Sequence, residues 1–207
     1  MNRIIVAGIG PGNPEYMVPA ALTAIKNARV LVGGSRALTQ FAGENQITMA
    51  VKSDIKAVME FIRKQLMEQD VVVMVSGDPG YYSLLDSLRR EFPETRISVI
   101  PGISSMQLAF SRLSLPWHDA ELLSMHGREP APEKLRYSSG RILGFLTDGK
   151  NNSRTVPEKL MAAGWPEGTR MFICSRLSYD DEEIIATTLG KASDVREYTH
   201  CILVVME

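Results

Sequence analysis

The sequence predicts an α/β protein built from two α/β domains. Short apolar runs rich in β-branched residues follow one another along the chain, and segments with apolar residues at helical spacing lie between them. Such alternation is typical of parallel sheets with crossover helices. The chain has 207 residues, 44% of them hydrophobic and 23% charged, which is a globular composition with length for one large or two small domains.

Four strands are expected in the first half, because each of these runs is continuous and apolar, like a strand buried on both faces. They are Ile4–Ala7, Val30–Val32, Val71–Val75 and Ile97–Ile100. Helices are expected at Pro19–Asn27, Ile55–Gln69, Tyr82–Phe92 and Ser105–Leu113. In the second of these helices, apolar residues from Ile55 to Leu66 fall on one stripe, which predicts a face packed on a sheet.

The second half repeats the pattern, with a polar stretch at residues 128–139 that we expect to form a loop and a short helix. The expected strands are Glu121–Ser124, Ile142–Leu146, Arg170–Cys174 and Cys201–Val205. A helix is predicted at Pro157–Ala163, since it opens on proline and closes near a glycine. A proline-aromatic turn follows residue 113, so we place the domains at 1–113 and 114–207.

The charge balance excludes a strong overall field. The 23 basic and 24 acidic residues give a net charge of -1, which argues against binding of nucleic acid or of anionic membranes. No apolar stretch approaches the ~18 residues of a membrane helix, and the N-terminal run lacks a cleavage site, so we expect a soluble cytoplasmic protein. We expect Cys174 and Cys201 to be buried, reduced thiols, and the three histidines lack the spacing of a metal site.

Three glycine-containing loops come directly after predicted strands. They cover residues 8–12 (GIGPG), 76–80 (SGDPG) and 101–105 (PGISS). Glycine permits close backbone approach and positive φ, and ligands of open α/β sheets bind beyond the carboxyl ends of the strands. The sequence therefore predicts a small-molecule site formed by these loops.

A dinucleotide-binding fingerprint is the rival interpretation of the first loop, and it fails in detail. The fingerprint needs glycine where Asn13 stands, and Pro11 removes an amide donor. The acidic residue expected about twenty residues later is also missing, since the second strand leads into Gly33 and Gly34. A nicotinamide or flavin enzyme is therefore disfavoured.

Asp78 is the charged residue of the second loop. An acid at a strand end, held in a glycine-proline turn, suits a cationic amine or a pair of hydroxyl groups. The alternative is an aspartate that only forms the turn and caps the next helix. Ser104 and Ser105 can likewise cap a helix, contact a ligand, or do both.

Taken together, these loops resemble the signatures of the tetrapyrrole methylase family of S-adenosylmethionine-dependent enzymes. GIGPG, SGDPGYY and PGISS match in order and spacing. Further segments, VGGSR at 32–36, PGISSMQLAFSRLSLPW at 101–117, SMHGR at 124–128, LTDG at 146–149 and RLSYDDE at 176–182, resemble members that methylate C-5 of a late precorrin or cobalt-precorrin in cobalamin biosynthesis. The resemblance covers essentially the whole chain. One departure is Met125, where relatives often carry leucine or alanine, and we expect no consequence from it.

The resemblance implies a folded S-adenosylmethionine in a cleft between the two domains. The implied donor contacts are Ile9, Gly77, Asp78, Tyr81, Ser104, Ser105, Leu146, Ser175 and His200. It also implies a homodimer. In some relatives a second domain, which methylates C-15 with decarboxylation, is fused behind the first. This sequence stops at Glu207 and resembles the stand-alone C-5 enzymes, so we expect a separate C-15 partner.

Methyl transfer from a sulfonium to an electron-rich tetrapyrrole carbon needs orientation more than a strong base. Arginines suit the carboxylates of such a substrate, because their forked donors match carboxylate geometry. The substrate-binding candidates are Gly10, Pro11, Gly12, Arg36 and Arg112, with Arg154 and Lys150 also considered. His126 and Arg128 are the catalytic candidates, orienting the substrate; His126 is equally suited to removing a proton or to satisfying a loop carbonyl.

Other classes remain as alternatives. A methylase of the same fold acting on RNA (ribosomal RNA ribose) or on protein (diphthamide type) is one, although an RNA enzyme should show a basic surface. A non-enzymatic tetrapyrrole- or nucleotide-binding module is another. Three glycine loops at one sheet edge favour catalysis over binding alone.

Overall fold

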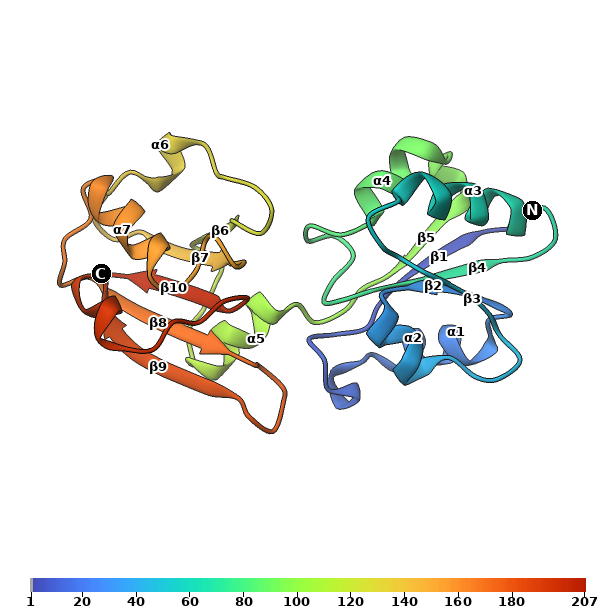
Figure 1. Cartoon of the computed structure of the whole chain (residues 1–207), viewed down its shortest axis with the longest axis horizontal. Helices are drawn as coiled ribbons and strands as arrows, with labels where there is room; N and C mark the ends of the chain where they lie inside the picture. Colours follow the sequence, from blue (N-terminus) through green and yellow to red (C-terminus); the bar gives the residue numbers. More distant parts are fainter. Residues whose placement is uncertain (1) are drawn as a thin grey trace. The chain divides into compact units, whose positions relative to one another are not determined.

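The computed structural model describes residues 2–207, and the chain divides into two compact units, Met1–Ser104 and Ser105–Glu207 (Figure 1). The division comes earlier than the predicted break after Leu113. The reason is that helix α5 (Ser105–Arg112) packs against strands β7 and β10 of the second unit. This helix therefore belongs to the second unit rather than ending the first.

The first unit contains a five-stranded, parallel sheet in the order β3-β2-β4-β1-β5. Its strands are β1 (Ile4–Gly8), β2 (Val30–Gly33), β3 (Ile47–Ala50), β4 (Val71–Val75) and β5 (Ile97–Ile100). Four of them confirm the predicted runs. The prediction missed β3, a short edge strand whose residues are exposed or half-buried, so its sequence lacks the continuous apolar character of the others.

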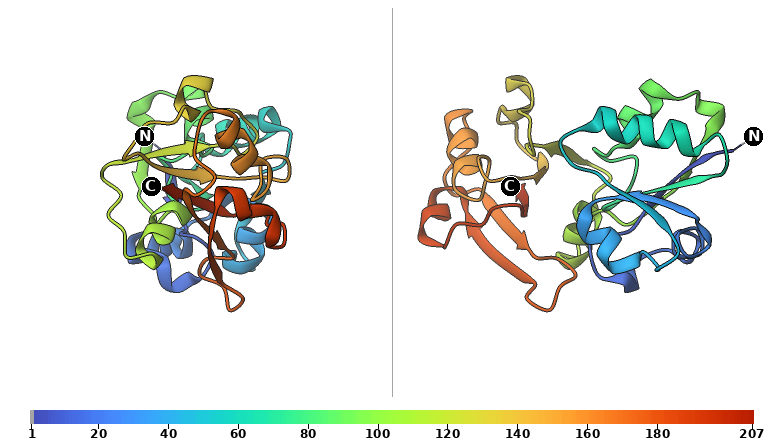
Figure 2. Two further views of the ribbon diagram at one scale, coloured as in Figure 1. Left: turned by 90° about the vertical axis from the view of Figure 1, so that its left-hand side faces the viewer. Right: turned by 45° about the vertical axis from the view of Figure 1, so that its right-hand side comes forward.

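Helices cover both faces of this sheet (Figures 1 and 2). They are α1 (Pro19–Asn27) and α2 (Ser35–Phe41) on one face, and α3 (Ile55–Gln65) and α4 (Leu85–Glu91) on the other. Helix α3 packs its apolar stripe, including Val58 and Ile62, on the valines of β2 and β4. The predicted stripe is thus confirmed, and the core lies in two layers around the central strands β1, β2 and β4.

The ends of two helices differ from the prediction for local reasons. Helix α3 begins after Asp54, whose carboxylate accepts the Ala57 N–H at 3.0 Å, and ends at Gln65 rather than Gln69. Helix α4 begins at Leu85 rather than Tyr82, because Tyr82 has φ +52°, which a right-handed helix excludes. Helix α2 was not predicted.

The second unit contains a mixed sheet in the order β6-β7-β10-β8-β9. Its strands are β6 (Ala120–Ser124), β7 (Ile142–Leu146), β8 (Arg170–Ser175), β9 (Glu183–Thr188) and β10 (Ile202–Met206). Only β6 and β7 pair in parallel, and the other three pairings are antiparallel. The expectation of parallel sheets throughout is therefore wrong for this unit. The link from β8 to β9, residues 176–182, is too short for a crossover and permits only an antiparallel partner.

Helices α7 (Thr155–Ala162) and α5 pack on opposite faces of the second sheet (Figures 1 and 2). Gly144 of β7 lets α5 approach, since a Cβ there would lie 2.7 Å from Met106 Sδ. Helix α7 begins before the predicted Pro157, because Asn152 Oδ1 accepts the backbone N–H groups of Arg154 (2.9 Å) and Thr155 (3.1 Å). The polar stretch carries the short helix α6 (Pro132–Leu135), as predicted.

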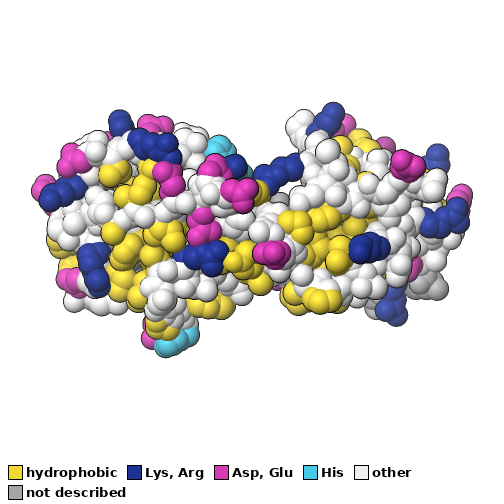
Figure 3. All heavy atoms as spheres, turned by 90° about the horizontal axis from the view of Figure 1, so that it is seen from below, with side chains coloured by type: hydrophobic (Ala, Val, Ile, Leu, Met, Phe, Trp, Pro, Cys, Tyr) yellow, Lys and Arg dark blue, Asp and Glu magenta, His cyan; other side chains and the backbone are white. Residues whose placement is uncertain are grey.

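Short 3₁₀ helices complete the fold, at Pro14–Tyr16, Glu94–Arg96 and Leu189–Asp194. On the face shown in Figure 3, basic and acidic side chains are interspersed, and neither sign forms a continuous patch. Across residues 2–207, no helix combines the length and the apolar character needed to span a bilayer.

Candidate functional site

The three glycine loops meet at the carboxyl edge of the first sheet, because β5, β1 and β4 are neighbours in it. Their backbones touch. A Cβ built on Gly102 would lie 2.2 Å from the Gly77 carbonyl oxygen, and one on Gly8 would lie 2.7 Å from the Gly102 nitrogen. Glycine is therefore required at these contacts, which only backbone atoms can make. The predicted convergence of the loops is observed.

A short two-residue bridge joins the first loop to the second. The Gly77 N–H donates to the Gly10 carbonyl at 2.8 Å, and the Gly10 N–H donates back at 3.4 Å. Both glycines have positive φ, +76° and +68° for Gly10 and Gly77. The buried Ile9 donates its N–H to the Val75 carbonyl at 2.9 Å, while Pro11 and Gly12 continue the loop as half-buried residues.

Asp78 connects the second loop to the third. One carboxylate oxygen accepts the Gly80 N–H at 2.8 Å, and the other accepts the Gly102 N–H at 3.0 Å. The first bond is the turn-forming role that the sequence suggested, and the second was not foreseen. Each carboxylate oxygen has a further lone pair, so the half-buried side chain can still accept a hydrogen bond from a ligand.

Tyr81 and Ser104 lie next to Asp78 and Gly77. Tyr81 donates its backbone N–H to the Asp78 carbonyl at 3.1 Å, and its ring stands edge-on to that of Tyr82. Its hydroxyl is buried and has no hydrogen-bond partner within residues 2–207, and burial raises its pKa above the ordinary value. Such orphaned hydroxyls are rare in proteins, so this one is suited to a polar ligand atom. Ser104 is buried beside Gly77.

A cavity of ≈ 250 Å³ opens at the carboxyl ends of β2 and β4. It is lined by Gly34, Val51, Met74, Val75, Ser76, Tyr82, Ser83 and Leu84. Arg36 is an exposed residue of α2 and follows Gly34 directly after Ser35, so it is attached to the same edge of the sheet as the glycine loops.

The predicted residues of the second unit also gather at one edge of their sheet. Strand β10 runs antiparallel to β7 and β8, so its first residues lie beside the carboxyl ends of these strands. Ile202 is opposite both Leu146 and Cys174. The half-buried Leu146, the buried Ser175 and the exposed His200 therefore lie at the same edge.

His126 lies at this edge too, in the loop after β6. Its Nδ1 is 3.1 Å from the Thr147 carbonyl oxygen, and its ring stands edge-on to that of His200 with centroids 5.8 Å apart. Below them, the Thr147 hydroxyl donates to the Cys201 carbonyl at 2.7 Å and accepts the Cys201 N–H at 2.8 Å. The sequence shows no spacing that pairs the histidines, because the pairing depends on the register of β7 and β10.

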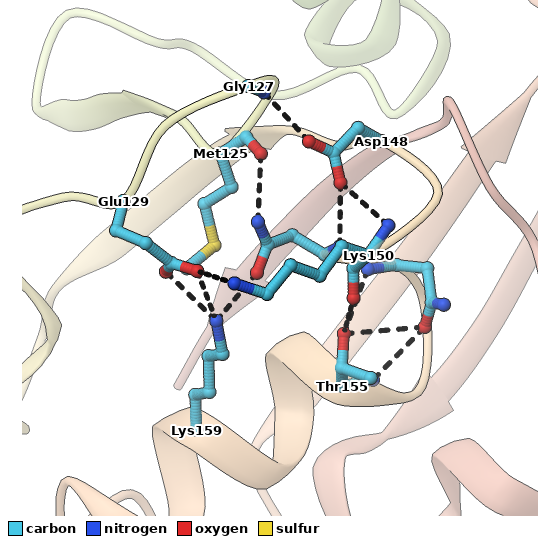
Figure 4. Close-up of polar contacts among 9 residues, drawn as sticks. Met125, Gly127, Glu129, Asp148, Lys150, Thr155 and Lys159 are labelled. Carbon is cyan, nitrogen blue, oxygen red and sulfur yellow. Dashed lines mark hydrogen bonds and ion pairs between the residues drawn. The ribbon is translucent and has the colours of Figure 1, made fainter.

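Asp148 holds the loop that carries His126 and Arg128 (Figure 4). Its carboxylate accepts three backbone N–H groups, from Gly127 at 2.7 Å, Lys150 at 2.8 Å and Asn151 at 2.7 Å. Hydrogen bonds from the backbone of Asn151 and Gly127 lower the pKa of Asp148 to about 2. The sequence reasoning missed this role, although an aspartate followed by glycine in a strand-end turn is a signal for it.

Helix α7 holds the same loop through Lys159 (Figure 4). Lys159 Nζ lies 2.8 Å from Glu129 Oε1 and 2.6 Å from Asn151 Oδ1, and Asn151 in turn donates to the Met125 carbonyl at 3.1 Å. The hydrogen bond from Lys159 lowers the pKa of Glu129. Arg128 is exposed, and the residues on either side of it are held in place, Gly127 by Asp148 and Glu129 by Lys159.

Two predicted residues of α5 have other surroundings. Ser105 is the half-buried first residue of that helix. Arg112 pairs with Glu182, Nε to Oε1 at 2.6 Å and Nη2 to Oε2 at 3.3 Å, and Glu182 also accepts the Ser178 N–H at 2.7 Å. A substrate carboxylate would have to compete with Glu182 for Arg112. Lys150 lies 3.6 Å from Glu129, and Arg154 donates to the Val195 carbonyl.

Comparison with known proteins gives a consistent result. A model of the family described as Tetrapyrrole (Corrin/Porphyrin) Methylases matches residues 3–193. The cobalt-precorrin-7 C(5)-methyltransferase of Salmonella typhimurium is 33% identical over 182 residues, 87% of this chain and 88% of that one. The probable cobalt-precorrin-7 C(5)-methyltransferase of Methanocaldococcus jannaschii is 29% identical, over 96% of both chains.

A solved structure has the same fold. The uroporphyrin-III C-methyltransferase of Thermus thermophilus, determined in complex with S-adenyl homocysteine, superposes with a TM-score of 0.77. The match covers 100% of this chain and 92% of that one, with 20% sequence identity. The two-unit architecture described above is therefore shared with it.

Proposed function

The chain belongs to the family of tetrapyrrole (corrin/porphyrin) methylases, and on that premise we propose that it methylates C-5 of a late cobalt-precorrin with S-adenosylmethionine. The reaction belongs to cobalamin biosynthesis. One observation carries the proposal: relatives from two distant organisms, matched over most of both chains, have names that specify this same reaction.

The first unit supports binding of the methyl donor. The contacts of Gly8 and Gly102 leave no space for side chains, so the backbone of these residues faces any ligand that lies against the loops. Asp78 retains free lone pairs, and the buried Tyr81 hydroxyl lacks a partner within residues 2–207. An amino acid with a ribose and an adenine ring offers the donors and acceptors that these groups lack. We propose donor contacts at Ile9, Gly77, Asp78, Tyr81 and Ser104, and at Ser105, Leu146, Ser175 and His200 of the second unit.

The chemistry asked of the protein is orientation. The sulfonium donor supplies the methyl group, and holding the reactants in line can contribute up to ~7–11 kcal/mol. His126 and Arg128 lie on a loop held by Asp148 and Lys159, so their positions are fixed relative to the second sheet. We propose that these two side chains orient the tetrapyrrole.

Carboxylates of the substrate need cationic partners. Arg36 and Arg128 are exposed and attached to the strand edges that carry the predicted site residues. Arg112 is a weaker candidate, because Glu182 already takes two of its donors. We propose that Arg36 and the backbone of Gly10, Pro11 and Gly12 contact the substrate.

We also propose a cytoplasmic homodimer and a separate enzyme for methylation at C-15. The two cysteines are free and buried, which suits a reducing compartment. Light scattering coupled to gel filtration measures the assembly directly, and a mass of one chain would contradict the dimer.

The test of the reaction uses the purified protein, methyl-labelled S-adenosylmethionine and cobalt-precorrin-7. We expect one labelled methyl group per product by mass spectrometry, placed at C-5 by NMR. A methyl group at another carbon, or transfer to RNA or protein in place of the tetrapyrrole, would refute the proposed function.

A further inference from the structure

The surroundings of His126 determine which of its two ring nitrogens carries the proton. Its Nδ1 lies 3.1 Å from the Thr147 carbonyl oxygen, which can only accept a hydrogen bond. The Nδ1 must therefore carry the proton, and in the neutral ring the lone pair is on Nε2. The residue is exposed, and Nε2 is the ring nitrogen that the contact with Thr147 leaves uncommitted.

The partner of Nδ1 is itself held in place. The Thr147 hydroxyl exchanges two hydrogen bonds with the Cys201 backbone, and the Thr147 N–H donates to the Cys201 carbonyl at 3.3 Å. A histidine whose second ring N–H donates to a fixed backbone carbonyl is the arrangement typical of metal-ligating histidines, because it sets both the tautomer and the ring direction.

The backbone and the ring plane of His126 are also restrained. The adjacent Gly127 N–H donates to Asp148, and the His126 N–H itself donates to the Ser124 hydroxyl at 3.3 Å. His200 stands edge-on to the imidazole at an interplanar angle of 65°. These contacts therefore set the position of Nε2 before a ligand binds.

A metal ion at Nε2 would have to bring its other ligands. Within residues 2–207, no three His, Cys, Asp or Glu side chains are grouped to hold a metal ion, so this imidazole would be a single protein ligand. A cobalt ion inside a tetrapyrrole already has four ring nitrogens, which leave its axial positions to other ligands. We propose that His126 Nε2 binds the cobalt of the substrate as an axial ligand; this inference rests on the proposed function.

The experiment uses electron paramagnetic resonance. The probe is a cobalt(II) corrinoid with free carboxylates, mixed with the full protein. One axial nitrogen splits each resolved cobalt line into a triplet, and ¹⁵N-histidine protein should convert the triplets into doublets. We expect this splitting in the wild type and its loss in His126→Ala and His126→Gln, the latter retaining a side-chain donor for the Thr147 carbonyl.

Two controls test whether the effect is specific. His118→Ala removes an exposed imidazole that pairs with Asp119 and should leave the splitting unchanged. The same corrinoid without metal should bind wild type and His126→Ala equally, whereas the cobalt form should bind His126→Ala roughly tenfold more weakly or worse. Equal weakening for both corrinoids, or splitting that persists in His126→Ala, would overturn the axial bond.

The outcomes separate this inference from the proposed function. A wild-type protein that methylates cobalt-precorrin-7 but shows no nitrogen splitting with bound corrinoid refutes axial ligation and leaves the reaction standing. A protein that neither binds the corrinoid nor methylates the precorrin refutes both. Splitting that disappears in His200→Ala but not in His126→Ala would identify His200 as the axial ligand and refute ligation by His126.

Discussion

Asp78 shows how a single side chain can serve both the structure and a ligand. Its two carboxylate oxygens each accept one backbone N–H, from Gly80 within the same loop and from Gly102, and the second bond connects two loops that are far apart in sequence. The loops supply the surface proposed for the methyl donor, so loss of the carboxylate should affect binding more than the fold.

We therefore predict that Asp78→Ala loses affinity for S-adenosylmethionine roughly tenfold or more, because hydrogen bonds to a charged group contribute about 1.5–3 kcal/mol each. Calorimetric titration measures the affinity, and circular dichroism checks that the fold persists.

Asp70→Ala is the matched control. Asp70 also accepts a backbone N–H, that of Arg3 at 2.7 Å, but it precedes β4 and so lies at the opposite edge of the sheet. Donor affinity should not change in this variant. If Asp78→Ala and Asp70→Ala bound the donor equally well, Asp78 would have no place in the site.

At the scale of elements, the first unit depends on backbone contacts between strand ends. A Cβ on Gly102 would meet the Gly77 carbonyl at 2.2 Å, and neither atom is on a flexible side chain. We predict that Gly102→Ala lowers the free energy of unfolding by about 1–3 kcal/mol or more, as overpacking does. Urea denaturation measures the change.

Gly34→Ala is the comparison for that prediction, since a Cβ there meets nothing within 4 Å and its φ is negative. Its unfolding free energy should change by less than about 1 kcal/mol. Equal destabilisation by the two substitutions would show that the strand ends are free to separate and that the contact at Gly102 is unimportant.

The loops after β6 and β7 depend on Asp148, whose pKa is lowered to about 2 by backbone hydrogen bonds. A carboxyl group with a depressed folded-state pKa contributes stability that is fully present above its unfolded-state pKa of ~3.9. This contribution is lost as the pH falls toward about 2. We predict that Asp148→Asn removes this part of the acid sensitivity.

The measurement is urea unfolding followed by the fluorescence of the buried Trp165, at several values between about pH 5 and pH 2. The difference in the free energy of unfolding between the wild type and Asp148→Asn should shrink as the pH falls across that range. A constant difference between the two proteins at every pH would contradict the assignment of this pKa.

At the scale of the whole molecule, charge separates the proposed function from an RNA-directed methylase. The net charge is -1, and charges of both signs are interspersed on the face shown in Figure 3. Since nonspecific RNA binding needs clustered basic residues, we predict no retention of ribosomal RNA fragments at physiological salt in a mobility-shift assay. Retention that weakens steeply with added salt would favour the alternative.

Much of the fold could be predicted from residues alone, and the errors have local causes. The valine-rich β4 was predicted with its correct ends, because a strand buried on both faces has a continuous apolar run. In strand β9, half-buried residues alternate with exposed ones and polar threonines are included. The strand therefore lacks the continuous apolar run that predicts a buried strand. Without β9, the antiparallel half of the second sheet could not be anticipated.

The candidate site was predictable where it depends on short segments. Glycine directly after a predicted strand indicates the loops at 8–12, 76–80 and 101–105, and the structure brings these loops together. The pairing of His126 with His200, and the support from Asp148, depend on strand register across many residues. No local pattern encodes the pairing of the two histidines, so only the structure shows it, whereas an aspartate followed by glycine in a strand-end turn does indicate a turn-holding role for Asp148.

Strand β10 occupies the middle of the second sheet, between β7 and β8, although it is the last of the strands to be synthesised. While the ribosome still covers residues 202–206, β6–β7 and β8–β9 can exist only as separate pairs with unsatisfied edges. The second unit can therefore complete its sheet only after residues 202–206 have left the ribosome, and until then the edges of β7 and β8 have no strand partner. Cells that make this protein at high rates should depend on chaperones during that interval, and deleting residues 202–206 should leave a nascent product that aggregates.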